Sequence, residues 1–135
     1  MARSAVAEAP KTETENSRDG LNLSQKKDFI YIVAALHNTD HGLAETVIQV
    51  SKSSYDAVET ARRVEELGYQ FYEDETGASV YRLEMDRQYN RFLFRLPQDG
   101  KVPADYPIVF RRYKKNGAWC EEWFSDTLKF IMGLH

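Results

Sequence analysis

Aromatic and β-branched residues form two short runs in the first half of the chain. Residues 29–33 (Phe-Ile-Tyr-Ile-Val) and 46–50 (Thr-Val-Ile-Gln-Val) are separated by the polar stretch 38–42. These side chains are enriched in strands, and polar residues with a glycine are typical of the turn between two strands. The pattern predicts two strands that form a β-hairpin.

A helical pattern follows the second run. Ser53 offers a hydroxyl cap, Asp56 offers a carboxylate in the first turn, and apolar residues then recur at helical spacing: Val58, Ala61, Val64 and Leu67. Gly68 is suited to the end of a helix because glycine readily adopts the left-handed conformation found there. The sequence predicts a helix over residues 54–67.

Further strands are predicted after this helix. Residues 69–72 and 80–85 flank a turn at Gly77, which predicts a second hairpin. In residues 91–96, Phe92 and Phe94 alternate against Arg91 and Arg95, and Pro97 and the Asp99-Gly100 pair follow. This alternation predicts another strand, closed by a turn.

Asn116-Gly117 lies between two aromatic-rich runs, and Asn-Gly is the preferred pair for a two-residue hairpin turn. Counting outward from this turn gives a register with two opposite-charge pairs and one aromatic pair. The predicted cross-strand pairs are Lys114 with Trp119, Tyr113 with Cys120, Arg112 with Glu121, Arg111 with Glu122, and Phe110 with Trp123. Each such pair contributes about 0.2–1 kcal/mol, and their coincidence in one register favours this hairpin.

These elements predict an α+β fold, a twisted antiparallel sheet of five to seven strands. The 54–67 helix and a short C-terminal helix, capped by Ser125-Asp126 and ended near Gly133, would cover the sheet. Residues 25–135 are expected to form a single domain. Residues 1–24 contain no aromatic side chain, which predicts a disordered N-terminal tail.

A second interpretation concerns residues 42–85. Gly42 to Glu45, a helix ending in Glu65-Glu66-Leu67-Gly68-Tyr69, and Thr76-Gly77 before Tyr81-Arg82-Leu83 resemble the winged-helix transcription regulators. The resemblance implies a helix-turn-helix core at 25–85 with a β-rich C-terminal extension. Against it, residues 46–50 are rich in β-branched side chains, and the helix that would enter the DNA groove is net negative.

Length and cysteine content limit the classes of protein. The chain has 135 residues, one cysteine and a formal net charge of −3. This length allows one domain, and the lone Cys120 excludes a disulfide-stabilised scaffold and favours a reducing compartment such as the cytoplasm. The longest apolar run, residues 29–36, is far shorter than the ~20 residues of a membrane-spanning helix. We therefore expect a soluble intracellular protein without a membrane partner.

The charge is unevenly distributed along the chain. Residues 25–86 hold six Lys/Arg and twelve Asp/Glu, whereas residues 87–118 hold eight Lys/Arg and two Asp/Glu. The hairpin register assigns Arg111 and Arg112 to Glu122 and Glu121, which leaves other basic and aromatic residues as a candidate contact surface. The candidate partner-binding residues are Arg87, Arg91, Arg95, Tyr113, Lys114, Lys115 and Trp119.

Candidate chemistry is sparse. His37 and His41 stand four residues apart with Asp40 between them, a weak candidate for a metal site that has no clear third ligand nearby. The sequence has no glycine-rich phosphate loop, Gly-x-Ser-x-Gly elbow or Cys-x-x-Cys pair. No cofactor and no enzymatic activity are predicted.

The sequence therefore favours a non-catalytic protein–protein interaction module, a small regulator, adaptor or inhibitor whose partner could be acidic. Tyr, Trp and Arg, which are frequent in interface hot spots, are abundant in its second half. The alternative is a nucleic-acid-binding protein that uses either a winged helix or the basic, aromatic strands of 87–118. Pairing of an edge strand with a second copy would give a homodimer, and this also stays open.

Overall fold

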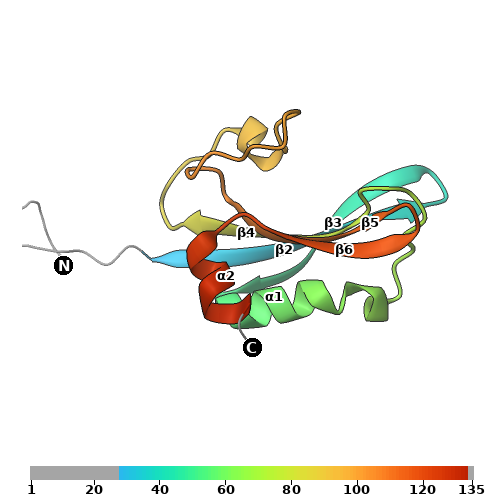
Figure 1. Ribbon diagram of the computed structural model, residues 1–135, viewed down its shortest axis with the longest axis horizontal. Coiled ribbons are helices and arrows are strands. Elements are labelled where there is room, and N and C mark those ends of the chain that lie inside the picture. Colours follow the sequence, from blue (N-terminus) through green and yellow to red (C-terminus); the bar gives the residue numbers. More distant parts are fainter. Residues whose placement is uncertain (1–27, 134–135) are drawn as a thin grey trace, which may run out of the picture.

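The computed structural model describes residues 28–133, which contain one five-stranded antiparallel sheet, two α-helices and two 3₁₀ helices (Figure 1). The strands lie in the order β3-β2-β4-β5-β6. In chain order the elements are β2 (Phe29–Thr39), β3 (Gly42–Ser51), α1 (Ser54–Arg62), η1 (Val64–Leu67), β4 (Gly77–Glu84), η2 (Arg91–Phe94), β5 (Ile108–Lys115), β6 (Ala118–Trp123) and α2 (Asp126–Gly133).

The first two strands form the predicted hairpin, and both are longer than the sequence runs that indicated them. Thr39 pairs with Gly42 across the Asp40-His41 turn, and the register shifts by one residue between Val33 and Ala34. Residues 46–50 are thus part of a strand. This contradicts the winged-helix interpretation, in which the same residues belong to a helix.

Helix α1 begins where the sequence predicted. The Ser53 side chain accepts a hydrogen bond from the backbone N–H of Asp56 at 3.1 Å, which satisfies one of the free donors of the first turn. The α-helix ends at Arg62, and the 3₁₀ helix η1 continues to Gly68, which has a φ of 88°. The predicted 54–67 helix is therefore present, but its last turn has 3₁₀ geometry.

The main core lies between α1 and one face of the sheet. Ala57, Val58 and Ala61 of α1 are fully buried against Val33 of β2 and Val80 of β4. Leu128 and Met132 of α2 close the same core, and Figure 1 shows α2 near the N-terminal end of α1. One face of the sheet is thus covered by both helices.

The β5–β6 hairpin has the predicted register, residue for residue, from Phe110↔Trp123 to Lys114↔Trp119. Asn116 and Gly117 have φ values of 53° and 79°, the positive values that the Asn-Gly turn requires. The sequence could specify this hairpin because its turn and its cross-strand pairs are all local.

Two details of the predicted fold are wrong. Residues 69–72 form no strand; they make one isolated bridge, between Asn38 and Gln70. Residues 91–96 are not a strand either, since η2 occupies Arg91–Phe94 and the Asn90 side chain caps it by accepting from the N–H of Phe92. The sheet accordingly has five strands across the described residues, the lower end of the predicted range.

The C-terminal helix agrees with the prediction. The hydroxyl of Ser125 accepts a hydrogen bond from the N–H of Leu128 at 3.2 Å, and α2 runs over Asp126–Gly133. The predicted disordered tail, residues 1–24, lies outside the described residues. Between residues 28 and 133, no helix is both long and apolar enough to cross a membrane.

Candidate binding surface

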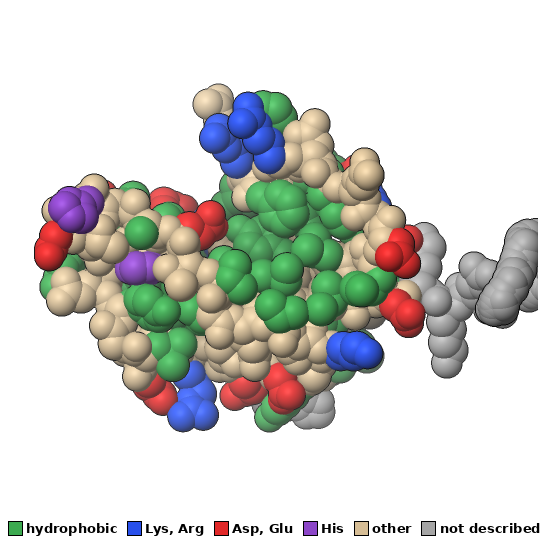
Figure 2. Space-filling view, turned by 180° about the vertical axis from the view of Figure 1, so that it is seen from behind, with side chains coloured by type: hydrophobic (Ala, Val, Ile, Leu, Met, Phe, Trp, Pro, Cys, Tyr) green, Lys and Arg blue, Asp and Glu red, His purple; other side chains and the backbone are tan. Residues whose placement is uncertain are grey.

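The face of the sheet opposite α1 carries an apolar hollow. Strand alternation places Ile32 and Ala34 of β2, Val47 of β3, and Tyr81 and Leu83 of β4 on this face. With Glu45 and Phe94 they line a hollow of about 290 Å³. Figure 2 shows hydrophobic side chains gathered in this depression, between a lobe that carries basic side chains and the β2–β3 hairpin.

The wall of the hollow is the connection between β4 and β5, residues 85–107. It crosses to the side of the sheet opposite α1 and carries η2 (Figure 1). The ring of Phe94 lies edge-on to that of Tyr81, with centroids 5.2 Å apart. Leu96 and Val102 pack on a second small core of Ala34, Tyr81 and Ile108. These contacts hold the connection against the sheet along one side and leave the β3 side uncovered.

A second hollow, of about 260 Å³, extends the surface toward β5. It shares Ala34, Glu45, Tyr81 and Phe94 with the first hollow, so the two adjoin along the sheet. Its other lining residues include Ser79, Arg95, Arg111 and Tyr113. The surface thus runs from an apolar end at Leu83 to a polar end at Tyr113, and we call these two adjoining hollows the open groove.

Burial raises the pKa of Tyr81 above its usual value, and the Glu45 carboxylate raises it further. The Tyr81 phenol is therefore protonated at neutral pH. It contributes an apolar ring and a neutral hydroxyl to the floor of the open groove. Such a group suits binding through packing and hydrogen bonding.

Arg91 and Arg95 are basic residues of the η2 lobe. Their guanidinium carbons lie 5.0 Å and 5.9 Å from the ring centroid of Phe92, an exposed side chain. Neither arginine forms an ion pair with any carboxylate of the described residues.

Arg111 and Arg112 differ from them because both are neutralised internally. Arg111 contacts Glu75 at 2.6 Å and Glu122 at 2.9 Å. Burial opposes the charge of Arg111, but hydrogen bonds to the two carboxylates outweigh it and raise its pKa. Arg112 pairs with Glu65 at 2.9 Å and with Glu121 at 3.1 Å, and the hydrogen bond to Glu65 is the main cause of its raised pKa.

The structure divides the residues predicted to bind a partner between the two faces of the sheet. Arg95 and Tyr113 both line the open groove. Lys114 and Trp119 lie on the opposite face, where the Trp119 ring packs edge-on to Phe71 with centroids 5.3 Å apart.

The remaining predicted residues lie apart from the groove lining. Arg87 stacks over the ring of Tyr89, 4.6 Å from its centroid, in a separate hollow near Pro107. Lys115 is exposed beside the β5–β6 turn. Of the predicted set, Arg95 and Tyr113 therefore line the open groove, and Arg91 lies on the lobe above it.

The candidate metal residues are also separated. His37 is buried in β2, where Nε2 lies 2.9 Å from Oγ1 of Thr46 and the ring packs against Tyr69. His41 is exposed in the hairpin turn next to Asp40. Residues 28–133 contain no group of three His, Cys, Asp or Glu side chains that could hold a metal ion.

Sequence reasoning missed Tyr81, Val47 and Phe94, which form much of the open groove. Their alternation with polar residues is the same as that of an ordinary core face. An alternating strand has one buried side, but the sequence does not say that helices cover only one face of this sheet. Comparison with known proteins finds no family model, no curated protein and no solved structure that matches this chain.

Proposed function

We propose that the protein is a non-catalytic binding module, acting as a small regulator, adaptor or inhibitor, and that it takes a segment of a protein partner into the open groove. The observation that carries this proposal is an apolar floor beside the η2 lobe, whose Arg91 and Arg95 form no ion pair with any carboxylate of residues 28–133. Val47 and Phe94, which line the hollow, expose 59% and 37% of their surface, and Phe92, on the η2 lobe, exposes 54%. Neighbouring apolar groups with a charged rim are typical of protein interaction sites.

The chemistry of the partner follows from the two parts of the surface. The floor of Ile32, Val47 and Leu83 suits aliphatic or aromatic side chains. Arg91 and Arg95 suit carboxylates, because arginine donates paired hydrogen bonds in a geometry that fits them. The partner segment therefore combines apolar residues with Asp or Glu.

The test is site-specific photo-crosslinking in native lysate. A benzophenone amino acid replaces Phe92, which is exposed between the two arginines, and in a control variant it replaces Tyr72, which is 72% exposed at another part of the surface. We expect a protein adduct from position 92 that resists nuclease and is absent from position 72. An adduct that contains nucleic acid, or the same adducts from both positions, would overturn the proposal.

Charge reversal gives a second arm to this test. Arg91→Glu with Arg95→Glu should abolish the adduct, whereas Lys114→Glu with Lys115→Glu, which reverses two other cations without ion pairs among the described residues, should leave it intact. The affinity for a nucleic-acid partner would instead fall steeply as salt rises, and both pairs of substitutions would weaken it. Each phosphate contact adds to such binding without recognising a particular sequence.

A further inference from the structure

A second surface lies on the other side of β3. β3 is an edge strand, and no strand of residues 28–133 pairs with its outer side. In a hairpin with a two-residue turn, the pair that flanks the turn is hydrogen-bonded, and such pairs alternate along the strands. Thr39↔Gly42 flanks the turn and is therefore a hydrogen-bonded pair. Leu43, Glu45 and Val47 belong to the pairs without these bonds, so their backbone N–H and C=O groups point outward, away from β2.

Apart from the register shift near Val47 and the single charge of Glu45, this edge has few of the devices that limit strand addition. β3 has ten residues, without Pro, Lys or Arg, and Leu43, Val47 and Val50 are each about half exposed. Proteins commonly protect an edge strand with short length, Pro or an inward-pointing charge. The outer side of β3 is therefore a template for an extended polypeptide.

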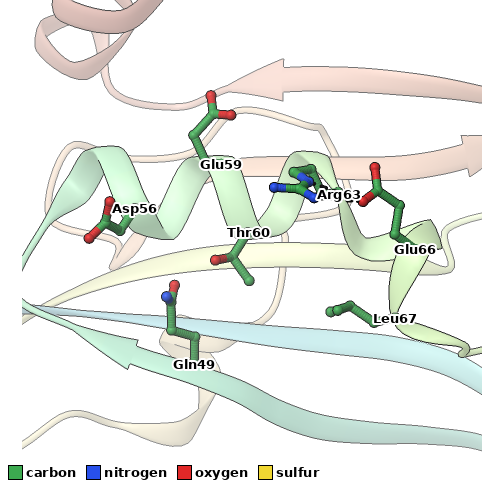
Figure 3. Close-up of a pocket in the computed structure, with 7 residues that line it drawn as sticks. All are labelled: Gln49, Asp56, Glu59, Thr60, Arg63, Glu66 and Leu67. Atoms are coloured by element: carbon green, nitrogen blue, oxygen red, sulfur yellow. Dashed lines mark hydrogen bonds and ion pairs between the residues drawn. The ribbon is translucent and has the colours of Figure 1, made fainter.

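A groove lies between the α1–η1 segment and β3, near Gln49 of this edge strand, and we call it the α1–β3 groove. It has a volume of about 380 Å³, and Figure 3 shows the Gln49 side chain rising from β3 toward Thr60 of α1. Ion pairs at the far side of the helix, Arg62 with Glu121 at 3.3 Å and Glu65 with Arg112 at 2.9 Å, tie the helical segment to β5 and β6. The β3 side of α1 has no such ion pairs in the described part of the chain and is left open.

The α1–β3 groove is acidic. Its charged residues are Asp56, Glu59, Arg63 and Glu66. Arg63 forms an ion pair with Glu66 at 2.9 Å, whereas Glu59 has only a longer contact with Arg62, at 3.8 Å. Asp56 has no ion pair within residues 28–133. The side-chain oxygen of Gln49 is buried in the same groove and accepts no hydrogen bond from any described residue.

We infer that β3 accepts an extended segment of a partner polypeptide as an additional strand, and that this segment alternates apolar residues with Lys or Arg. Side chains of a strand point alternately to the two faces of a sheet. One set therefore lies beside Val47 on the open face, and the other set enters the α1–β3 groove. There, cationic donors meet Asp56 and Glu59 and supply the hydrogen bond that Gln49 lacks.

A second copy of this chain fits the edge less well. Antiparallel pairing of two β3 strands would place the two α1 helices side by side on one face, with the carboxylates of Asp56 and Glu59 facing their counterparts. Like charges so placed are destabilising. The β3 residues that would enter the neighbouring groove, Ala44 and Thr46, carry no positive charge.

The probe is a peptide with blocked termini in which Val and Lys alternate. It has about eight residues, which is within the usual length of a strand. Its control alternates Val and Glu. We expect the lysine peptide to slow amide hydrogen exchange at Leu43, Glu45 and Val47 by about tenfold or more, with no effect from the glutamate peptide. Equal binding of both peptides, no binding at millimolar concentration, or binding without protection of these amides would overturn the inference. So would a chain that is dimeric through β3 before any peptide is added.

Substitutions separate the two components of this binding. Val47→Pro removes one outward N–H and should abolish peptide binding, whereas Val47→Thr keeps the N–H and should retain it. Asp56→Asn with Glu59→Gln should weaken binding about tenfold at low salt, whereas Asp105→Asn, which removes an exposed carboxylate elsewhere, should not. Equal effects of the two charge variants would contradict a role for the groove.

This inference does not rest on the proposed function. Phe94→Ala and the Arg91→Glu, Arg95→Glu variant alter the open groove and leave the α1–β3 groove unchanged. Peptide binding should persist in both variants even if the crosslinked partner is lost.

Discussion

The ring of Phe94 meets the ring of Tyr81 edge to face, with centroids 5.2 Å apart and an interplanar angle of 64°. Tyr81 belongs to β4 and Phe94 to η2, so this contact joins the 85–107 connection to the sheet. Together with the packing of Leu96 and Val102, this pair of rings holds the groove wall in position.

Phe94→Ala should release the connection without unfolding the sheet. Because Phe94 is 37% exposed, we expect the free energy of unfolding to fall by about 1–2 kcal/mol, less than for a fully buried phenylalanine. Hydrogen exchange should quicken at the N–H of Arg95, which bonds the carbonyl of Phe92, while β2 and β4 amides stay protected. Phe92→Ala, the matched control, should change stability by less than about 0.5 kcal/mol. Equal losses in both variants would show that Phe94 does not anchor the connection.

Arg111 should be the most important cation for stability. Its side chain is only 14% exposed and bridges Glu75 and Glu122. Arg111→Gln leaves these two carboxylates without their shared partner, and we expect a loss of about 2 kcal/mol in urea unfolding. Arg95→Gln, an exposed arginine without an ion pair among the described residues, should cost less than about 0.5 kcal/mol. A loss at Arg95 as large as that at Arg111 would be incompatible with this assignment.

The Glu65–Arg112 pair should make stability depend on acid pH. The hydrogen bond from Arg112 lowers the pKa of Glu65 in the folded protein. A lowered folded-state pKa contributes stability that is present above the unfolded value, about 4.3, and is lost as pH falls through the folded value. Glu65→Gln should therefore destabilise at pH 7, by no more than about 1 kcal/mol for this partly exposed pair, and have little effect near pH 3. Urea unfolding at both pH values measures the difference in the free energy of unfolding between the wild-type protein and the variant. The same difference at pH 7 and pH 3 would contradict this prediction.

Gly77 should tolerate no side chain. It has a φ of 150° at the start of β4, and a Cβ there would collide with the backbone carbonyl of Arg112 on β5. Gly77→Ala should therefore cost more than about 2 kcal/mol and disturb the β4–β5 pairing. Gly100→Ala is the control, because Gly100 also has a positive φ, of 74°, but open space around it. Its cost should be about 1 kcal/mol, and a cost equal to that of Gly77→Ala would argue against a steric cause.

Local signals explain which elements the sequence predicts correctly. The Asn116-Gly117 turn, the Ser53 cap and the Ser125 cap each act within a few residues, and all three are present as expected. The strand predicted at 69–72 is absent because this segment is held by a distant residue. Oδ1 of Asn38 accepts the N–H of Tyr72 at 2.7 Å, and the N–H of Asn38 donates to the carbonyl of Gln70.

The strand predicted at residues 91–96 is absent for a different reason. Its alternating pattern fits a strand, but the Asn90 side chain caps a 3₁₀ turn and so provides a competing local conformation. The open groove depends on which face of the sheet the helices cover and on where residues 85–107 fold back. Both are decided by contacts between residues far apart in the chain, such as Phe94 with Tyr81.

The connection between β4 and β5 begins and ends on neighbouring strands. Tyr81 pairs with Ile108, and the N–H of Arg82 bonds the carbonyl of Pro107 at 2.8 Å, so strand pairing alone brings its two ends together. Strand pairing therefore does not limit the length of residues 85–107, and their composition is limited only where Phe94, Leu96 and Val102 pack on the sheet. This segment could be exchanged as a cassette in protein engineering, which would give a new binding specificity on an unchanged scaffold.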